Sequence, residues 1–565
     1  MSSSAEVLPS SSTRVGSANF AVAILLLLAL LYVVPLGVRP LDSPDEVRYA
    51  AVAREMIASG NWVSPHFDGV RYFEKPPLGY WLTAASFKAF GENAFALRLP
   101  VAIATLLTAL VVAALARRFV SPFGARLALV VFLTTTLVAG VGTFAVLDAF
   151  LSLFLTCAIA AWYLATVEPP GRRRVLYLVL CGCACGGAFL VKGFLAWVIP
   201  ALVAVPHLAA RRQWRAMITL PWIPFVVAVA VALPWAVLIH LREPDFWRYF
   251  FWVQNVQRFA GDQAQHPRPV WFYLESLPVI AWPWILWVPA AALGLRGEGR
   301  SDFRRFLVLW VAMPFLFLSI SRGKLLTYVL PCFAPLSILV AAGLERYFAK
   351  GGRRAFRAAA LAAALLFALV LAALLVAQSG VAGAPLYSAT ELPKLVAFGA
   401  MLAAGAAGAA LAFRSRRLPL QVAGIAVAGT ATMLPVQFAL PQRAIEQRLP
   451  AVAIARYASA APDTIVVADA PLAGTAVWTL ARDDVYVVDA SELSYGMSYP
   501  EARYRDLAPR TLADFVESNR GRAEILLILK DDTERKLTPS LPAGADRSQH
   551  GFVVLLRFPR TPHDG

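Results

Sequence analysis

Long apolar runs recur along this chain, and no other feature limits its fold as strongly. From Phe20 to about Leu440, segments of membrane-spanning length, roughly 20 residues each, follow one another with short polar breaks. Hydrophobic residues make up 59% of the 565 residues, more than a soluble protein of this length can bury. The sequence therefore predicts a polytopic α-helical membrane protein.

We expect about thirteen transmembrane helices. Their approximate bounds are 19–38, 96–116, 126–143, 148–166, 175–191, 193–209, 218–239, 277–295, 303–320, 325–343, 357–377, 394–412 and 421–440. The first run is long and no small-x-small cleavage site follows it, so a retained span is favoured over a cleaved signal peptide. A tight turn at Lys192-Gly193 separates the fifth and sixth spans.

Arginine clusters between the apolar runs predict the orientation of the chain. They are Arg117/Arg118, Arg172/Arg173/Arg174, Arg211/Arg212/Arg215, Arg304/Arg305, Arg353/Arg354 and Arg414/Arg416/Arg417. Basic loops stay in the cytoplasm, so a cytoplasmic leader at 1–18 and an odd number of spans put the C-terminus in the periplasm of a bacterium. We attribute the net charge of +17 to these clusters, which set the orientation of the chain in the membrane. Since no basic groove with interleaved aromatics is present, we expect no nucleic-acid binding.

The character of the chain changes after Pro441. We expect a transmembrane domain at 19–442, with a periplasmic loop at 39–95 that carries two juxtamembrane helices, near 47–57 and 77–90. A soluble periplasmic α/β domain should occupy 443–565, with a helical or loop-like stretch at 508–518 and strands at 464–468, 485–488, 525–529 and 552–556. It has no Gly-rich phosphate loop, so we expect a structural or regulatory role.

The five cysteines lie within apolar runs and none lies in the tail domain. They are Cys157, Cys181, Cys183, Cys185 and Cys332. A disulfide framework is therefore not expected. The Cys181-Gly-Cys-Ala-Cys185 segment could bind metal, but small residues that pack helices together are the favoured interpretation.

Acidic residues are rare in the membrane domain and gather in loops on the expected periplasmic face. Asp42-Ser-Pro-Asp45-Glu46 follows the first span and resembles a helix start, where acids are favoured. Capping explains one or two of these carboxylates, so we expect chemistry at Asp45 with support from Asp42 and Glu46. Asp148 lies in an apolar stretch, where an unpaired charge is costly. It could cap the fourth span, but a functional role is favoured.

Cations on the same face run counter to the positive-inside bias. Lys75, in Tyr72-Phe-Glu74-Lys75-Pro-Pro, precedes an expected helix and could bind an anion there, although a Glu74–Lys75 surface ion pair is an equal alternative. Further basic residues of this face are Lys192, Arg258, His266, Arg268 and Lys324. Headgroup contact could explain any one of them, whereas a phosphate-bearing ligand explains the set.

A divalent metal (Zn, Mg or Mn) is a further candidate ligand. Glu74 and His266, together with Asp45 and Asp148, offer suitable oxygen and nitrogen donors. No local ligand spacing in the sequence requires such an ion.

Several motifs resemble those of the C-type membrane glycosyltransferases. They are Asp45-Glu46, Arg71-Tyr72-Phe-Glu74-Lys75-Pro, Asp148, Gln265-His266-Pro-Arg268-Pro and Ser321-Arg-Gly-Lys324 followed by Tyr328-Val-Leu-Pro331. Within this superfamily the chain is similar to the bacterial aminoarabinose lipid A transferases, which are relatives of the protein O-mannosyltransferases.

The resemblance implies a glycosyltransferase of the bacterial inner membrane. Such an enzyme takes 4-amino-4-deoxy-L-arabinose from undecaprenyl phosphate and transfers it to lipid A phosphates at the periplasmic face, which confers polymyxin resistance. The family's acidic residues correspond to Asp45 and Asp148, and its loop lysine to Lys75. The full set expected to bind the donor and its phosphate is Lys75, Tyr72, Arg258, Arg268, Lys192, Lys324 and Tyr328.

Other functions stay open on the sequence alone. The enzyme could transfer another sugar, or modify protein hydroxyls. A transporter of lipid-linked sugars is less favoured because no matching halves are visible and the polar groups gather at one face instead of the midplane. A non-catalytic scaffold would leave Asp148 unexplained.

Overall fold

The computed structural model describes Leu26 and residues 29–257, 266–297, 299, 301–381, 383–458 and 460–561. The expected leader at 1–18, the first part of the first span and Arg258 lie outside these residues.

Nine helices of the described part are long and apolar enough to cross a membrane. They are α4 (Ala94–Phe119), α7 (Asp148–Val167), α8 (Arg172–Lys192), Trp214–Arg242 with α10 (Trp214–Thr219) and α11 (Trp222–Arg242), α15 (Asp302–Ile320), Leu326–Ala349 with η5 (Leu326–Cys332) and α16 (Phe333–Ala349), α17 (Arg354–Gln378), Ala389–Arg414 with α18 (Leu392–Arg414), and α19 (Leu418–Phe438). Each coincides with an expected span, so the chain is a multi-pass α-helical membrane protein.

The other expected spans take different forms. The described end of the first is η1 (Ala29–Val33) with η2 (Val34–Gly37), and the sixth is the shorter α9 (Leu195–Ala210). The span at 277–295 is a pair, α13 (Phe272–Ile280) and Trp284–Leu295, bent by 98°. The structure thus supports nine or ten spans, and thirteen stays a prediction.

The span expected at 126–143 divides into α5 (Pro122–Leu133) and α6 (Thr136–Val141). At the break the hydroxyl groups of Thr134 and Thr135 donate to the carbonyl oxygens of Val130 and Val131, both at 2.6 Å. Such bonds to the preceding turn bend helices. Apolar content alone could not reveal this interruption.

The loop at 39–95 contains the two expected helices, α2 (Asp45–Ser59) and α3 (Leu78–Phe90). The first ends at Gly60, whose φ of 67° is a conformation that glycine adopts without strain. Between the helices lies a short hairpin of β1 (His66–Phe67) and β2 (Val70–Arg71).

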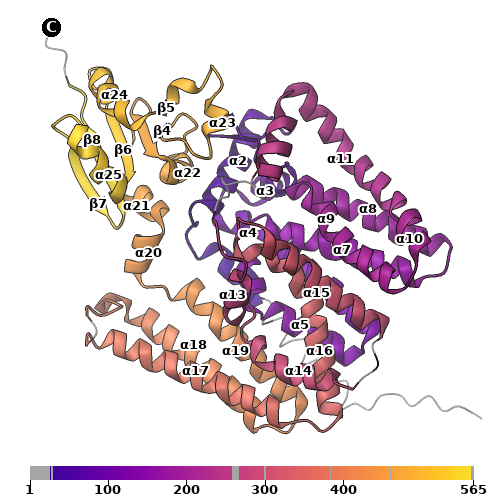
Figure 1. Cartoon of the computed structure of the whole chain (residues 1–565). Coiled ribbons are helices and arrows are strands. Elements are labelled where there is room, and N and C mark those ends of the chain that lie inside the picture. Colours follow the sequence, from indigo (N-terminus) through magenta and orange to yellow (C-terminus); the bar gives the residue numbers. More distant parts are fainter. Residues whose placement is uncertain are drawn as a thin grey trace, which may run out of the picture.

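The tail domain is a sheet with helices against it (Figure 1). The strand order is β5-β4-β3-β6-β8-β7, parallel from β5 to β6 and antiparallel beyond. The bounds are β3 (Ile465–Asp469), β4 (Tyr486–Val488), β5 (Asp506–Leu507), β6 (Ile525–Lys530), β7 (Asp546–His550), β8 (Val553–Phe558), α20 (Gln442–Arg448), α21 (Pro450–Tyr457), α22 (Ala470–Thr479), α23 (Ser494–Met497), α24 (Leu512–Asn519) and α25 (Asp531–Leu537). The four expected strands are confirmed. Sequence analysis missed the edge strands: β5 has two residues and β7 is polar and mostly exposed.

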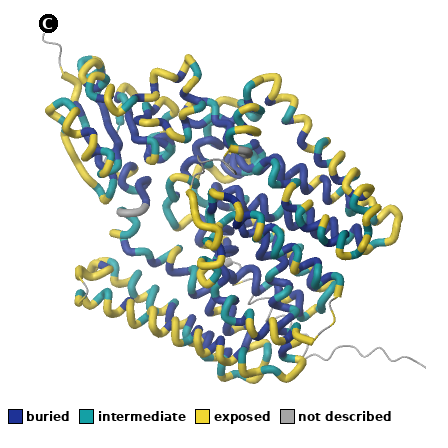
Figure 2. Tube along the Cα trace, viewed as in Figure 1, coloured by how far each residue is buried: buried dark blue, intermediate teal, exposed yellow. Residues whose placement is uncertain are grey.

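The tail domain packs against the loop at 39–95, beside α2 (Figure 1). Val52 and Phe67 of the loop share a buried apolar cluster with Val487 and Leu493 of the tail. The loop and the tail therefore lie on the same side of the membrane domain. Large apolar side chains stay exposed along α11, α17 and α18 (Figure 2), as a surface that faces lipid requires.

Candidate active site

Asp148, the first residue of α7, forms an ion pair with Lys192, the last residue of α8. The Lys192 Nζ lies 2.7 Å from Asp148 Oδ1, and the two side chains are only 12% and 9% exposed. The same Nζ lies 4.6 Å from the ring centroid of Tyr328 in η5. Three residues predicted for the site, from three distant segments, thus meet. Each charge of the pair compensates the other where water is scarce.

Asp45 lies in the first turn of α2, one helical turn before Arg48. The Arg48 guanidinium pairs with Asp45 and also with Glu492 of the tail domain. Asp45 keeps 33% of its side chain exposed, so it stays more accessible than Asp148. The tail domain therefore reaches the predicted acidic site through Glu492.

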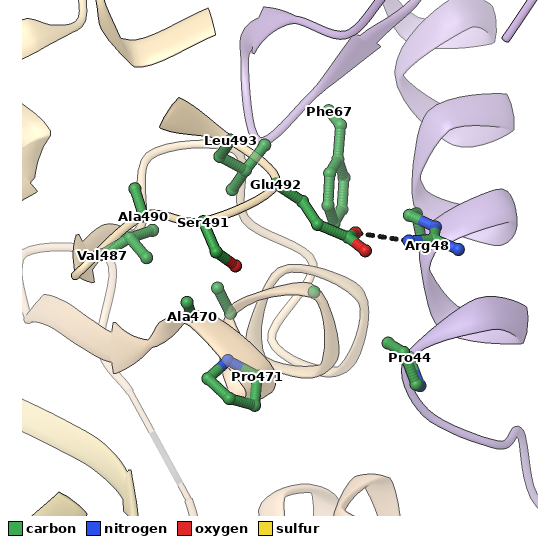
Figure 3. A pocket seen from close by; sticks show the side chains of 12 residues that line it. Pro44, Arg48, Phe67, Ala470, Pro471, Val487, Ala490, Ser491, Glu492 and Leu493 are labelled. Carbon is green, nitrogen blue, oxygen red and sulfur yellow. Dashed lines mark hydrogen bonds and ion pairs between the residues drawn. The ribbon is translucent and has the colours of Figure 1, made fainter. Parts of the chain in front are cut away.

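Arg48 and Glu492 line a small pocket between α2 and the tail sheet (Figure 3). It is lined by Pro44, Arg48, Phe67, Ala470, Pro471, Ala473, Gly474, Val487, Ala490, Ser491, Glu492 and Leu493. Sequence analysis missed both charged residues. Arg48 stands next to the recognised acids and could have been suspected, but nothing in the sequence connects Glu492 with a site more than 400 residues earlier.

Tyr49 of α2 lies in the field of both candidate acids. Burial raises the pKa of Tyr49 well above its usual value, Arg48 opposes the shift, and the negative charges of Asp45 and Asp148 add to it. The Tyr49 ring centroid lies 6.0 Å from that of Tyr80. The charges of the two acids therefore act on the same half-buried tyrosine.

Tyr72, Glu74 and Lys75 approach this region from the loop after β2. Tyr72 is buried, and burial raises its pKa well above the usual value, opposed by Arg48 and reinforced by Glu74. The half-buried Lys75 donates from Nζ to the Glu74 carbonyl oxygen at 2.9 Å. The Glu74 carboxylate is buried and accepts a hydrogen bond from Gln254 Nε2 at 3.4 Å. Tyr72 therefore lies near both Arg48 and Glu74.

Lys324, Arg268 and His266 form a second group, where two loops meet. Lys324 is buried and donates from Nζ to the carbonyl oxygens of Arg268, at 3.0 Å, and of Ser321. Its backbone N–H donates to the His266 carbonyl oxygen at 3.2 Å. Arg268 and His266 are exposed. Lys324 therefore ties the loops together, while Arg268 stays accessible to a ligand.

The metal ligands suggested by the sequence do not gather. Among the described residues, no three His, Cys, Asp or Glu side chains are close enough to hold an ion together. Glu74 and His266 thus form no such site in that part of the chain.

Glu46 and Asp42 support the start of α2. Glu46 is fully buried and accepts the Asp42 backbone N–H at 2.9 Å. Its ion-pair partner is Arg98 of α4, 2.6 Å away and also fully buried. Sequence analysis missed Arg98, although a lone arginine within an apolar run is itself a signal.

The comparisons with known proteins agree with this architecture. Residues 17–250 match the family described as dolichyl-phosphate-mannose-protein mannosyltransferase, and residues 445–557 match the C-terminal domain of the arabinosyl transferase ArnT. The undecaprenyl phosphate-alpha-4-amino-4-deoxy-L-arabinose arabinosyl transferase of Edwardsiella ictaluri is 38% identical over 552 residues, which cover 95% of this chain and 98% of the relative. The chain belongs to this arabinosyl transferase family.

Other members support the assignment. The protein of the same name from Aeromonas salmonicida is 38% identical over 544 residues, 94% of this chain and 98% of that one. The crystal structure of ArnT from Cupriavidus metallidurans in the apo state aligns with a TM-score of 0.77 and 25% identity, covering 97% of this chain and 98% of that one. The resemblance inferred from the motifs is confirmed.

Proposed function

We propose that this protein transfers 4-amino-4-deoxy-L-arabinose from undecaprenyl phosphate to phosphate groups of lipid A. The observation that carries the proposal is the ion pair of Asp148 with Lys192, together with Asp45, whose charge acts with that of Asp148 on Tyr49. Two carboxylates and a cation at the edge of a membrane suit a reaction between a phosphate-linked sugar and a charged acceptor. The identity of the sugar and its carrier comes from the names of the full-length relatives.

The departing group of the donor is undecaprenyl phosphate. The bond between the sugar C1 and the carrier phosphate oxygen breaks, and a bond from C1 to an acceptor phosphate oxygen forms. Negative charge on the leaving phosphate increases in the transition state, so cations held in place beforehand lower the barrier most. Lys75 and the exposed Arg268 are the candidates for this role, and Lys192 forms the ion pair with Asp148.

The carboxylates would orient the reactants. A lipid A phosphate is already largely ionised near neutral pH, so little proton removal is needed and positioning matters more. Asp45 is the more exposed acid and suits the acceptor side. The amino group of the donor sugar is a cation that either carboxylate could attract.

We further infer thirteen spans in a bacterial inner membrane, with the active site and the tail domain in the periplasm. The arginine clusters support this orientation: Arg117 and Arg118 end α4, whereas Asp148 begins α7 at the opposite end of the bundle. Packing of the tail against the loop at 39–95 agrees with it.

Lipid A mass spectrometry tests the function. A strain that lacks its own aminoarabinose transferase is complemented with this gene, or with the Asp45→Asn, Asp148→Asn or Asp532→Asn variant. The wild type and the exposed tail variant Asp532→Asn should add the pentosamine and raise polymyxin resistance. The two site variants should insert into the membrane but add none.

An unmodified lipid A with the wild-type gene would overturn the proposal. A second candidate function is transfer of a sugar to protein hydroxyls, which the mannosyltransferase match at 17–250 favours. Sugar on membrane proteins, together with unmodified lipid A, would identify that activity.

A further inference from the structure

Glu46 has a buried carboxylate that binds more than one segment of the chain. Its side chain has no exposed surface, and Arg98 donates to it from Nε at 2.7 Å and from Nη2 at 2.6 Å. The carboxylate also accepts the backbone N–H groups of Ala145 and Asp42, both at 2.9 Å. Arg39 lies 3.3 Å away as a second cation. Capping the start of α2 would require fewer contacts than Glu46 makes.

The Arg98 guanidinium likewise bonds to several segments of the chain. Besides the two bonds to Glu46, its Nη1 donates to the carbonyl oxygens of Leu36 and Arg39, both at 2.8 Å, and its Nη2 donates to that of Pro40 at 2.9 Å. These contacts occupy all five N–H groups of the guanidinium. A helix that enters the membrane thus uses one arginine to hold the chain that leaves the first span.

The pair joins four segments that carry the proposed chemistry. They are the end of the first span, the start of α2, α4, and the loop before α7. Asp45 directly precedes Glu46, and Asp148 follows Ala145 by three residues. The Glu46 carboxylate thus accepts the backbone N–H group three residues before each candidate acid, at Asp42 and at Ala145.

Stability alone does not explain such a pair. Well-packed apolar residues of similar volume often stabilise a protein as much as a buried ion pair does. They could not accept the N–H groups of Ala145 and Asp42, and so could not tie the loop before α7 and the start of α2 to one point.

We propose that Glu46 and Arg98 are positioning residues, which set the spacing and orientation of Asp45 and Asp148. This inference rests on the proposed transferase function. Without the pair both acids remain, but their backbones are no longer tied to one point. Loss of alignment by about 1 Å can lower turnover about 10²-fold while binding persists. The expected signature is thus a fall in kcat with little change in KM for the donor.

The test compares Arg98→Lys and Glu46→Gln with Arg118→Lys, each purified and assayed for pentosamine transfer per folded molecule. Arg118 is the matched control, because it lies at the other end of α4 and pairs with Glu168, just after the end of α7. We expect the first two variants to lose about 10²-fold in kcat and the control to keep wild-type kcat. Should Arg98→Lys not fold, Glu46→Gln provides the same test, since it leaves the three carbonyl bonds of Arg98 intact.

A double-mutant cycle separates positioning from a merely structural role. Single-turnover rates are measured for Asp148→Asn with and without Glu46→Gln. Positioning predicts that Glu46→Gln adds little once the carboxylate of Asp148 is absent. An undiminished additional loss, or single variants with normal kcat per folded molecule, would overturn the inference. Failure of the wild type to transfer the sugar would instead refute the proposed function.

Discussion

At the scale of single residues, the site depends on charges that have little water around them. Lys192 and Asp148 are each about nine-tenths buried and neutralise one another across 2.7 Å. Removing one partner from such a pair leaves an uncompensated buried charge. The Asp148 carboxylate would then lose the partner that holds it in the position where it acts.

Replacement of Lys192 by methionine, which has similar length and no charge, should therefore disable the site. We expect loss of about 10²-fold or more in kcat/KM, the usual effect of removing one preorganised polar group from an active site. Transfer of the sugar by purified enzyme in proteoliposomes measures it. Lys350→Met is a control, because Lys350 lies just after the end of α16 and donates to the carbonyl oxygens of Gly294 and Arg296. Equal activity of Lys192→Met and wild type would show that Lys192 has no role in the active site.

Glu55 makes the junction between loop and tail sensitive to pH. Burial raises its pKa to about 7, against the N–H groups of Gly69 and Asp68 that it accepts. The folded protein therefore keeps a proton on Glu55 up to about pH 7, whereas the unfolded chain loses it near the usual glutamate pKa of 4.5. The folded state binds more protons between these values, so stability falls as pH rises across them.

We expect the unfolding temperature to drop by a few degrees between pH 5 and pH 8, a range that spans the titration of Glu55. The Glu55→Gln variant, which keeps an acceptor oxygen and cannot ionise, should show a smaller drop. Thermal unfolding in detergent at several pH values is the measurement. A slope that is identical in both proteins would show that Glu55 does not contribute.

At the scale of elements, the hairpin of β1 and β2 anchors the tail domain. Its turn residue Asp68 forms a fully buried ion pair with Arg505 at 2.5 Å and accepts the Val485 N–H at 3.0 Å. Gly69 has a φ of 68° and approaches the tail so closely that an added Cβ would lie 2.6 Å from the Asp483 carbonyl oxygen. This β-hairpin of four paired residues therefore holds the tail domain against the loop at 39–95.

Gly69→Ala should loosen this docking, and Gly60→Ala is its matched control. Both glycines have nearly the same φ, 68° and 67°, but a Cβ on Gly60 would meet nothing within 4 Å. The backbone strain of about 1 kcal/mol is therefore common to the two variants, and the clash with the tail belongs to Gly69 alone. Limited proteolysis near α20 should release the tail faster from Gly69→Ala. Equal rates would mean that the turn does not hold the tail.

At the scale of the whole molecule, topology decides which reactants can reach the site. The tail and the loop at 39–95 share a buried core, so they must lie on one side of the membrane. No natural cysteine lies in the tail, and all five lie in the membrane domain. Single introduced cysteines can therefore report the side directly.

A cysteine in place of Asp532, whose side chain is 79% exposed, should react with a membrane-impermeant maleimide when only the outer membrane is opened. A cysteine in place of Arg172, exposed at the start of α8, should react only after the inner membrane is broken. A protein with Cys183, the exposed natural cysteine, replaced by serine serves as the background. The opposite labelling pattern of the two cysteines would show that the proposed orientation is wrong.

The sequence by itself determined the elements. Apolar runs specify membrane helices because a lipid-facing segment must satisfy its own backbone, and short apolar runs specified the four central strands of the tail. Asp148 was identified because a lone charge in an apolar stretch is costly wherever the chain folds. Each of these inferences depends on neighbours along the chain.

The tertiary structure decided which charges meet. Arg48 and Glu492 are 444 residues apart, Glu46 and Arg98 are 52 apart, and Asp148 and Lys192 are 44 apart. No local period encodes such partners, because they depend on how whole helices pack and on where the tail docks. The acids and Lys192 were visible in the sequence, whereas Arg48, Arg98 and the pairing of each cation with its acid became visible only once the chain was folded.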